Sequence, residues 1–362
     1  MDLIQDEPAG NGYQGPQIGA VRQHSDEKLS LDSLSKDAEW LCGMVARSQE
    51  MRALFENIRR IGPTRSTVLL QGALGTGKEL AARALHAIGG VRSGPFVTFN
   101  CSWLTDSDEE EAASQLFGRE QSGENVGEMP GYFRAAAGGT LFLDEIDSLP
   151  FALQGTLLRV LETSAVQPVG SSSSYHVDVR TIAAARRDLE ESVAAGTLRA
   201  DLVLKITALT LSIPELASRQ EDIRPLSAFF LEKYNRVLGN RMTSIRSEAM
   251  NALESYSWPG NVRELSRAIE EAVAADNGDC VEIENLPSEI SESLMVHAGD
   301  PHRPTAANRE MDGSSTENVM RATLERSLRQ TSGNRRRAAN LLGISRSTLY
   351  RMLTRYGLDA ER

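Results

Sequence analysis

Eight consecutive residues, GALGTGKE at positions 72 to 79, have the types and order that bind phosphate. They follow an apolar run, STVLLQ, and precede a segment with helical periodicity, LAARALHAI, as a phosphate-binding loop requires. Glycines let backbone N–H groups turn toward phosphate oxygens, and the start of the helix adds the positive end of its dipole. A glycine-rich turn without a ligand is the weaker interpretation, because strand, loop, lysine and helix occur together. We predict nucleotide binding by the whole loop, with the lysine reaching the outer phosphates: Gly72, Ala73, Leu74, Gly75, Thr76, Gly77, Lys78 and Glu79.

Two carboxylates, Asp144 and Glu145, end a second apolar run, TLFLDEI. Open α/β sheets bind ligands at the carboxyl ends of their strands. Glu79 stands where the general motif has Ser or Thr for Mg²⁺, so the metal has to rely on another carboxylate. We predict that Asp144 holds Mg²⁺, directly or through water, and that Glu145 polarises the attacking water. A solvated strand edge is the alternative, and the phosphate-binding loop argues against it.

The C-terminal segment is basic, unlike the rest of the chain. Between Thr331 and Arg362, seven arginines stand against two acidic residues, which gives a charge of +5. The whole chain carries −11, so residues 1–330 carry −16. A basic module attached to an acidic body indicates that the module binds nucleic acid.

The same segment has the spacing of a helix-turn-helix. A first helix would run from Asn334 to Leu342, a turn would follow at Gly343, and a second helix would begin after Ser345 and reach about Tyr356. The exposed first turn of the second helix could reach base edges and phosphates, whereas a merely solvated basic helix is the weaker alternative. We predict contacts with double-stranded DNA from the exposed polar and basic residues of both helices: Arg336, Arg337, Ser345, Arg346, Ser347, Thr348, Tyr350 and Arg351.

The elements that position these residues follow from the apolar pattern. Five short apolar runs between about residues 40 and 214 alternate with longer amphipathic or polar segments: STVLLQG, PFVTFNC, TLFLDEI, VDVRTIAAA and ITALTLSIP. That alternation predicts an α/β fold with a parallel sheet covered by helices. After Pro214 the strand signals disappear, and three amphipathic segments predict a small helical domain.

The composition of the sequence limits the class of protein, and its turn-forming residues predict where the domains begin and end. No stretch approaches a membrane span, and the N-terminus lacks the features of a signal peptide, so we expect a cytoplasmic protein without a membrane partner. Three distant cysteines indicate neither a disulfide framework nor a zinc site. No receiver or ligand-sensing domain is expected before residue 40. The expected parts are a disordered leader (1–39), an α/β nucleotide-binding subdomain (40–214), a helical lid (215–290), a linker (291–313) and the helix-turn-helix domain (314–362).

The order of short motifs resembles the bacterial enhancer-binding proteins, which are AAA+ activators of the sigma-54 form of RNA polymerase. The resemblance covers about residues 41 to 358 and rests on GTGKEL, PFVTFNC, LFG, GGTLFLDEID, LQGTLLRVLE, VDVRTIAA, LRADL, EDI, WPGNVREL and a tail similar to the Fis-type DNA-binding module. It implies an AAA+ P-loop domain with a helical lid, ATP and Mg²⁺ as cofactors, and rings, usually hexamers, on DNA upstream of promoters. It also implies that Asn100 is a switch restraining Glu145, that Arg199 is an arginine finger for a neighbouring subunit, and that Arg263 senses nucleotide from the lid.

One loop departs from the family pattern. Where the family carries GAFTGA after LFG, this chain reads SGENVG at 122–127, with Glu124 at the Phe position and Asn125 at the Thr position. Replacing the Phe loses its burial, about 1.5 to 3 kcal/mol, and adds a charge to desolvate. RNA polymerase holoenzyme therefore remains an expected partner, but the loop argues against the usual contact with sigma-54.

Three further positions depart from the family. Ala185 and Arg186 replace the usual Thr-Asn pair, which removes a polar group that monitors the terminal phosphate. Lys205 replaces the second finger arginine and lacks its planar fork, and Ala217 replaces another arginine. We expect nucleotide binding with impaired hydrolysis.

Three functions are compatible with these features. The first is an ATP-binding, DNA-binding transcription regulator that forms homo-oligomers, from dimer to hexamer, and acts without the sigma-54 power stroke. The second is a functional sigma-54-dependent activator ATPase, alone or in a mixed ring whose partner supplies GAFTGA. The third is an AAA+ machine acting on protein clients, against which the helix-turn-helix argues strongly.

Overall fold

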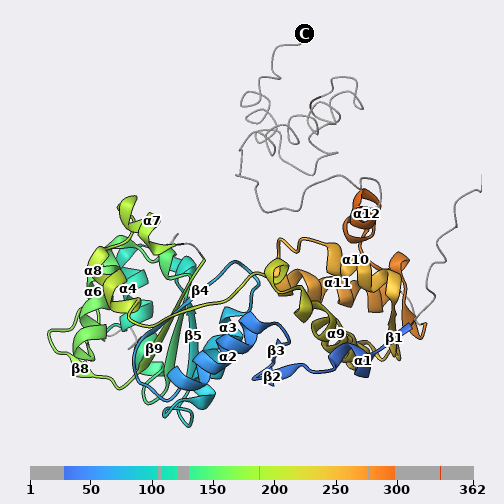
Figure 1. Ribbon diagram of the computed structural model, residues 1–362. Helices are drawn as coiled ribbons and strands as arrows, with labels where there is room; N and C mark the ends of the chain where they lie inside the picture. The colour runs from blue at the N-terminus through green and yellow to red at the C-terminus, as the bar shows by residue number, and fades with distance from the viewer. Residues whose placement is uncertain are drawn as a thin grey trace, which may run out of the picture. The chain divides into compact units, whose positions relative to one another are not determined.

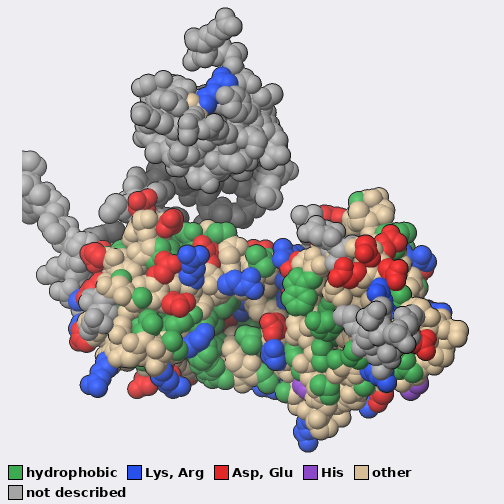
Figure 2. All heavy atoms as spheres, turned by 180° about the vertical axis from the view of Figure 1, so that it is seen from behind, with side chains coloured by type: hydrophobic (Ala, Val, Ile, Leu, Met, Phe, Trp, Pro, Cys, Tyr) green, Lys and Arg blue, Asp and Glu red, His purple; other side chains and the backbone are tan. Residues whose placement is uncertain are grey.

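The computed structural model describes residues 28–104, 108–120, 130–186, 188–275 and 278–297, together with Arg335. The chain divides into two units, 1–299 and 300–362, and the first unit contains a central sheet and a helical lid (Figure 1). None of the helices among these described residues is long and apolar enough to cross a membrane. Acidic and basic side chains are interspersed on the described surface of the face in Figure 2.

A five-stranded parallel sheet forms the centre of the predicted nucleotide-binding subdomain, in the order β10-β4-β9-β6-β5. Each of the five apolar runs provides one strand, which confirms the predicted α/β class. The strands are β4 (Val68–Gln71), β5 (Phe96–Asn100), β6 (Thr140–Asp144), β9 (Arg180–Ala185) and β10 (Thr210–Ser212). Because all five strands run the same way, the loop after β4, the carboxylates Asp144 and Glu145 at the end of β6, and Arg186 after β9 meet at one edge of the sheet.

Helices cover both faces of this sheet (Figure 1). The helices α2 (Gln49–Ile61) and α3 (Lys78–Ile88) pack on one face, and α4 (Glu109–Phe117), α6 (Phe151–Thr163) and α8 (Ala200–Ile206) pack on the other. Successive strand residues alternate between the two cores, as the pleat requires. Burial on both faces explains why the strands read as unbroken apolar runs.

Shorter elements complete the subdomain. They are the hairpin strands β2 (Glu39–Leu41) and β3 (Met44–Ala46), the turns η1 (Cys101–Leu104) and η2 (Ile146–Ser148), the helices α5 (Gly131–Ala135) and α7 (Leu189–Ala194), and the strands β7 (Ala165–Val166) and β8 (Tyr175–His176). Strand β3 contributes to two cores. Its residues Met44 and Ala46 pack with α2 and α3, whereas Val45 between them packs in the core of the lid.

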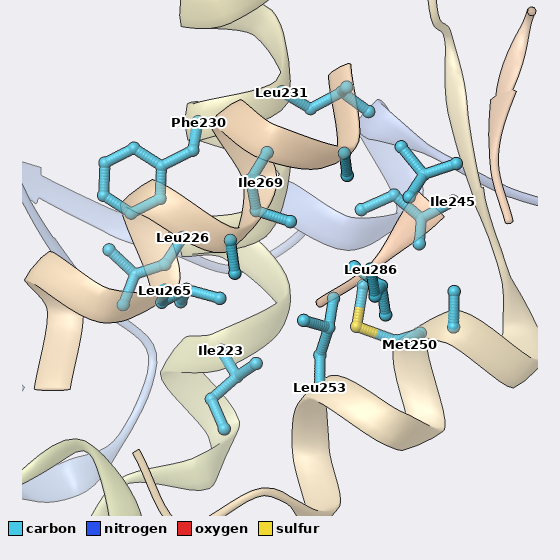
Figure 3. Close-up of a cluster of buried hydrophobic side chains, with 14 of the residues drawn as sticks. Ile223, Leu226, Phe230, Leu231, Ile245, Met250, Leu253, Leu265, Ile269 and Leu286 are labelled. Carbon is cyan, nitrogen blue, oxygen red and sulfur yellow. The ribbon is translucent and has the colours of Figure 1, made fainter. Parts of the chain in front are cut away.

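The lid is built on three helices at the positions that the sequence predicts. These are α9 (Ile223–Leu238), α10 (Ser247–Ser255) and α11 (Asn261–Ala275), and short turns η3 (Leu216–Ser218), η4 (Gln220–Asp222) and η5 (Ile283–Asn285) connect them to their neighbours. Their apolar faces form one cluster (Figure 3). In it, Leu226 of α9 lies beside Leu265 of α11, and Met250 lies beside Leu253 on α10.

The lid also contains strands, so the prediction that strands end at Pro214 was wrong there. The strands β11 (Ser244–Arg246) and β12 (Cys280–Val281) pair in parallel, and β1 (Lys28–Ser30) pairs antiparallel with β11. Segments of two or three residues are too short for a period to appear in the sequence.

The predicted limits of the leader and the linker also need correction. Residues 28–39 are not a disordered leader, because β1 and helix α1 (Leu31–Ser35) join the lid and bury Leu34 in its core. Ser30 caps α1 by accepting a hydrogen bond from the Ser33 N–H. At the other end, α12 (Ser288–His297) continues past residue 290, where the linker was expected to begin.

A buried ion pair joins the lid to the rest of the unit. The Asp222 carboxylate accepts hydrogen bonds from the Arg47 N–H at 2.6 Å and from the Ser48 N–H and hydroxyl at 2.8 Å each. Arg219 lies 3.8 Å from this carboxylate and donates to the Thr76 carbonyl at 3.0 Å. Burial lowers the pKa of Arg219, and the charge of Asp222 opposes that shift. The start of α2, the start of the lid and the phosphate-binding loop are thereby linked.

We expect Asp222→Ala to lower the free energy of unfolding by about 3 to 5 kcal/mol, because it leaves the Arg219 charge buried without its partner. Asp178→Ala is the control, since Asp178 pairs with Arg65 on the exposed surface and solvated pairs contribute little. Denaturant unfolding of both variants measures the difference. Similar losses in the two variants would contradict the structural role of Asp222.

Candidate nucleotide-binding site

The loop between β4 and α3 has the backbone geometry of an anion site. Gly75 and Gly77 adopt left-handed conformations, with φ of +79° and +109°, which glycine reaches without a steric cost. Gly77 is the N-cap of α3 and provides no side chain to cap it. The first N–H groups of this helix are therefore available to an anion.

Lys78 lies inside the loop. Its ammonium group donates to the carbonyls of Gly72 at 2.7 Å and Ala73 at 3.0 Å, and the Thr76 hydroxyl also donates to Ala73, at 2.9 Å. Burial lowers the pKa of Lys78, and the nearby charge of Asp144 opposes that shift. A phosphate oxygen in the loop would favour the charged lysine in the same way as Asp144.

The lid holds the loop from the other side. The Asn261 side-chain amide donates to the Leu74 carbonyl at 3.0 Å and accepts from the Leu216 N–H at 2.8 Å. A Cβ atom on Gly75 would lie 2.2 Å from the Gly260 carbonyl oxygen. With Arg219 bound to Thr76, loop carbonyls at 74 and 76 are engaged by residues from outside the loop. Gly260 and Asn261 belong to the motif WPGNVREL, and Arg219 stands two residues before EDI, but the sequence alone gave none of these three residues a role.

The two predicted carboxylates differ in their surroundings. Asp144 ends β6, and its Oδ1 accepts the Glu145 N–H at 3.0 Å. Burial raises the pKa of Asp144, against the opposing charge of Lys78. Glu145 has a φ of 54°, a left-handed conformation that costs about 1 to 3 kcal/mol for a residue other than glycine. Such strain is typical of functional sites.

Asn100 contacts Glu145, as the resemblance implies. The register of the sheet places Asn100 beside Asp144, and Asn100 Nδ2 donates to Glu145 Oε1 at 3.4 Å. The amide oxygen of Asn100 accepts from the Ser102 N–H at 2.9 Å and from its hydroxyl at 2.8 Å. These two bonds fix the amide with its NH₂ group toward Glu145.

Arg186 makes a contact that the sequence alone did not predict. It follows β9 directly, and its Nη2 donates to Glu145 Oε1, the same oxygen that faces Asn100. The sequence marked Arg186 as a departure from the family pattern but could not give the direction of its side chain. Two donors therefore converge on one oxygen of the predicted catalytic carboxylate.

A cavity of about 270 Å³ lies over these groups, between the sheet edge and the lid. Lys78, Asp144, Glu145 and Arg186 form its charged side. Its apolar side is formed by Leu74 of the loop, Leu80 of α3, Phe230 of α9 and Val262 of α11. The polar residues Arg263 and Ser266 of α11 also line the cavity. Such a cavity fits a ligand with an anionic end and a flat apolar end.

Most of the predicted nucleotide-binding residues meet at this cavity. It is lined by Leu74, Gly75, Gly77, Lys78, Glu79, Asp144, Glu145 and Arg263. Glu79 also pairs with Arg83 one turn along α3. Gly72, Ala73 and Thr76 belong to the loop without lining the cavity, and Asn100 reaches it only through Glu145.

Arg199 does not line this cavity. It is the N-cap of α8, and its guanidinium is half-exposed and paired with Asp201 at 2.7 and 3.0 Å. Its backbone N–H donates to Gln154 Oε1 at 2.8 Å. The altered loop at 122–127 and the predicted DNA contacts, Arg336, Arg337, Ser345, Arg346, Ser347, Thr348, Tyr350 and Arg351, lie outside the described residues.

Three family models match consecutive parts of the chain. They are the Sigma-54 interaction domain at residues 44–212, the AAA+ ATPase lid domain at 217–300, and the bacterial regulatory protein, Fis family, at 317–356. Transcriptional regulatory protein ZraR of Klebsiella oxytoca is 40% identical over 330 residues, which cover 91% of this chain and 72% of ZraR. The chain belongs to the sigma-54-dependent enhancer-binding proteins.

Other members of this family give the same result. Regulatory protein AtoC of Escherichia coli (strain K12) is 36% identical over 343 residues, covering 91% of this chain and 73% of AtoC. The crystal structure of NtrX from Brucella abortus in complex with ATP is similar, with 32% identity, a TM-score of 0.60, and coverage of 87% of this chain and 69% of NtrX. These matches confirm the predicted fold class, an AAA+ P-loop domain with a helical lid followed by a C-terminal helix-turn-helix.

We expect Gly75→Ala to lower the free energy of unfolding of the enhancer-binding protein by more than about 1 to 2 kcal/mol, which is the cost of a left-handed conformation for an L-residue. The additional loss arises because the new methyl group would meet the Gly260 carbonyl and push the loop away from the lid. Gly90→Ala is the control, because a Cβ atom there meets no atom within 4 Å. Thermal unfolding of both variants gives the comparison, and equal melting temperatures would show that the loop and lid are not in close contact.

Proposed function

We propose that this chain is a transcription regulator that binds ATP in the cavity between the sheet edge and the lid, binds DNA through its C-terminal module, and acts without the sigma-54 power stroke. The observation that carries the proposal is the bond between Arg186 and Glu145. It occupies the carboxylate that would activate water, whereas the loop that would bind phosphate is complete. A regulator of bacterial promoters works in the cytoplasm, where the DNA lies.

The cavity supports ATP as the ligand. The loop and Lys78 would hold the phosphates, and the apolar side with Phe230 and Val262 would face the base. Nucleotide binding is supported by NtrX, whose structure is described as a complex with ATP. Arg263 lines the cavity from the lid, where it could respond to the bound nucleotide.

Asp144 fits the requirement for Mg²⁺. Such ions in nucleotide sites take one or two carboxylates and complete their shell with phosphate oxygens and water. Among the described residues no group of three or more His, Cys, Asp or Glu side chains could hold a metal, so a single carboxylate with phosphates is the arrangement that fits. A cation beside Asp144 would favour its charged form, which burial disfavours. When bound, Mg²⁺ would supply positive charge to the phosphates.

We propose homo-oligomers, from dimer to hexamer, in which Arg199 reaches a neighbouring subunit's nucleotide. Its position outside the chain's own cavity supports this role, since a finger residue acts from another subunit. Its pairing with Asp201 holds the pKa of Arg199 above its usual value, so the group is always charged.

The sequence of the altered loop supports the absence of the usual power stroke. Glu124 and Asn125 stand where the family has the Phe and Thr that press against sigma-54. A charged residue there cannot bury itself in a partner without a desolvation cost. A second function is favoured by the match to the Sigma-54 interaction domain over residues 44–212: an activator ATPase at sigma-54 promoters, alone or with a partner that supplies GAFTGA.

We expect the purified chain, mixed with sigma-54 holoenzyme, a promoter with its operator and ATP, to give no transcripts above the level without activator. An activator with an intact GAFTGA loop on the same template is the positive control. A parallel reaction with sigma-70 holoenzyme measures regulation by the first mechanism. Strong sigma-54 transcription from the native chain alone would establish the second function instead.

We expect Arg346→Ala and Arg351→Ala each to weaken operator binding by about 1 to 3 kcal/mol if the side chain contacts a base edge. Gel shifts at fixed salt measure the affinity, because phosphate contacts depend on salt concentration. Arg362→Ala is the control, since Arg362 lies beyond the second predicted helix. Unchanged operator affinity in the first two variants would refute their role.

A further inference from the structure

Glu145 is held by two donors of unequal strength. Arg186 Nη2 and Asn100 Nδ2 both donate to Glu145 Oε1. The Asn100 contact of 3.4 Å is longer than a normal N–H···O bond, and its donor is neutral. The Arg186 contact joins a cation to a carboxylate, and such charge-assisted bonds are roughly twice as strong as neutral ones. Arg186 therefore has more influence than Asn100 on the position of Glu145.

The pair is shielded on the side of Glu145 and open on the side of Arg186. The Glu145 side chain is 13% exposed, and that of Arg186 is 41% exposed. A carboxylate that is mostly shielded from water has few alternative partners. Arg186, in contrast, can turn away without leaving a buried charge of its own.

Arg186 also acts on the groups that would surround the terminal phosphate. It lines the cavity with Lys78 and Asp144, and its positive charge lowers the pKa values of both groups. Burial has a larger effect on each of these pKa values, and the shared cavity places Arg186 beside the groups expected to surround the phosphate. A terminal phosphate would be a second anion for the same guanidinium, which has five N–H donors and can bind it while Nη2 still donates to Glu145.

We propose that Arg186 is a positioning residue that restrains Glu145 within the same chain and adds a cation for the terminal phosphate, so that ATP is bound firmly and hydrolysed slowly. The proposal rests on ATP as the ligand of the cavity. In hydrolysis the water oxygen bonds to the terminal phosphorus, and the bond from that phosphorus to the bridging oxygen breaks. ADP and inorganic phosphate form, and a water proton passes to Glu145. While Arg186 donates to Oε1, that oxygen is occupied and the carboxylate is held in place by the guanidinium.

The expected consequence is a long-lived ATP-bound form with slow turnover. This form persists because Arg186 contributes to phosphate binding and also engages Glu145. In Arg186 variants without the positive charge, ATP binding should weaken while ATP hydrolysis becomes faster. A merely structural role would not separate binding from hydrolysis in this way.

The test uses the full chain with Arg186→Asn, Arg186→Gln and Arg186→Lys. We expect the two neutral variants to raise kcat for ATP about tenfold or more, within the contribution of a general base, and to raise KM because a cation near the phosphate is lost. Arg186→Lys keeps the charge and should keep kcat low. Adding Glu145→Gln to Arg186→Asn should remove the gain, since no carboxylate is then released.

Two controls make the result decisive. Arg236→Asn removes an exposed arginine of α9 that pairs with Glu232 and should leave kcat and KM unchanged. Binding of a non-hydrolysable ATP analogue by the native chain, with Lys78→Ala as the weakened reference, tests the cavity itself. Intact binding with an unchanged or lower kcat in both neutral variants would overturn the restraint. Equal, negligible binding by native chain and Lys78→Ala would overturn ATP as the ligand, and the restraint with it.

Discussion

The buried pair of Arg219 and Asp222 is the interaction on which the rest of the structure depends. Both side chains are almost inaccessible to water, at 2% and 0% exposure, and together they contact the phosphate-binding loop and the start of α2. Charges so deeply buried are stable only when partners surround them. The loop, the start of α2 and the lid therefore hold their relative positions as one set, which keeps the cavity over the sheet edge.

This constraint divides the site into two parts. The phosphate-binding part is fixed several times over, since residues from the lid engage the carbonyls of Leu74 and Thr76 and close contact with Gly260 limits Gly75. The part that would activate water depends on side chains at the ends of β5, β6 and β9, where Arg186 reaches Glu145 in place of a neutral residue. A chain can thus retain the structure that binds a nucleotide while the water-activating groups change.

The sequence predicted the elements with strong periodicity and missed those defined by distant pairing. Five apolar runs gave the five strands, and α9, α10 and α11 lie where amphipathic segments stood. Strand β1 could not be predicted, because its three residues pair with β11 across more than two hundred positions. The meeting of Lys78 with Asp144 followed from parallel strands, but the bond from Arg186 to Glu145 depends on a side-chain direction. Arg219 and Asp222 are charged residues whose deep burial no hydropathy pattern indicates.

Strand β3 has a mechanical consequence for this unit. Met44 and Ala46 are anchored in one core and Val45 in the other, so three consecutive residues connect the two bodies across a single pleat. Sliding or separation of the bodies would pull at least one of these side chains out of its apolar surroundings. Strand β3 therefore acts as a second tie between the lid and the sheet, in addition to the buried pair of Arg219 and Asp222.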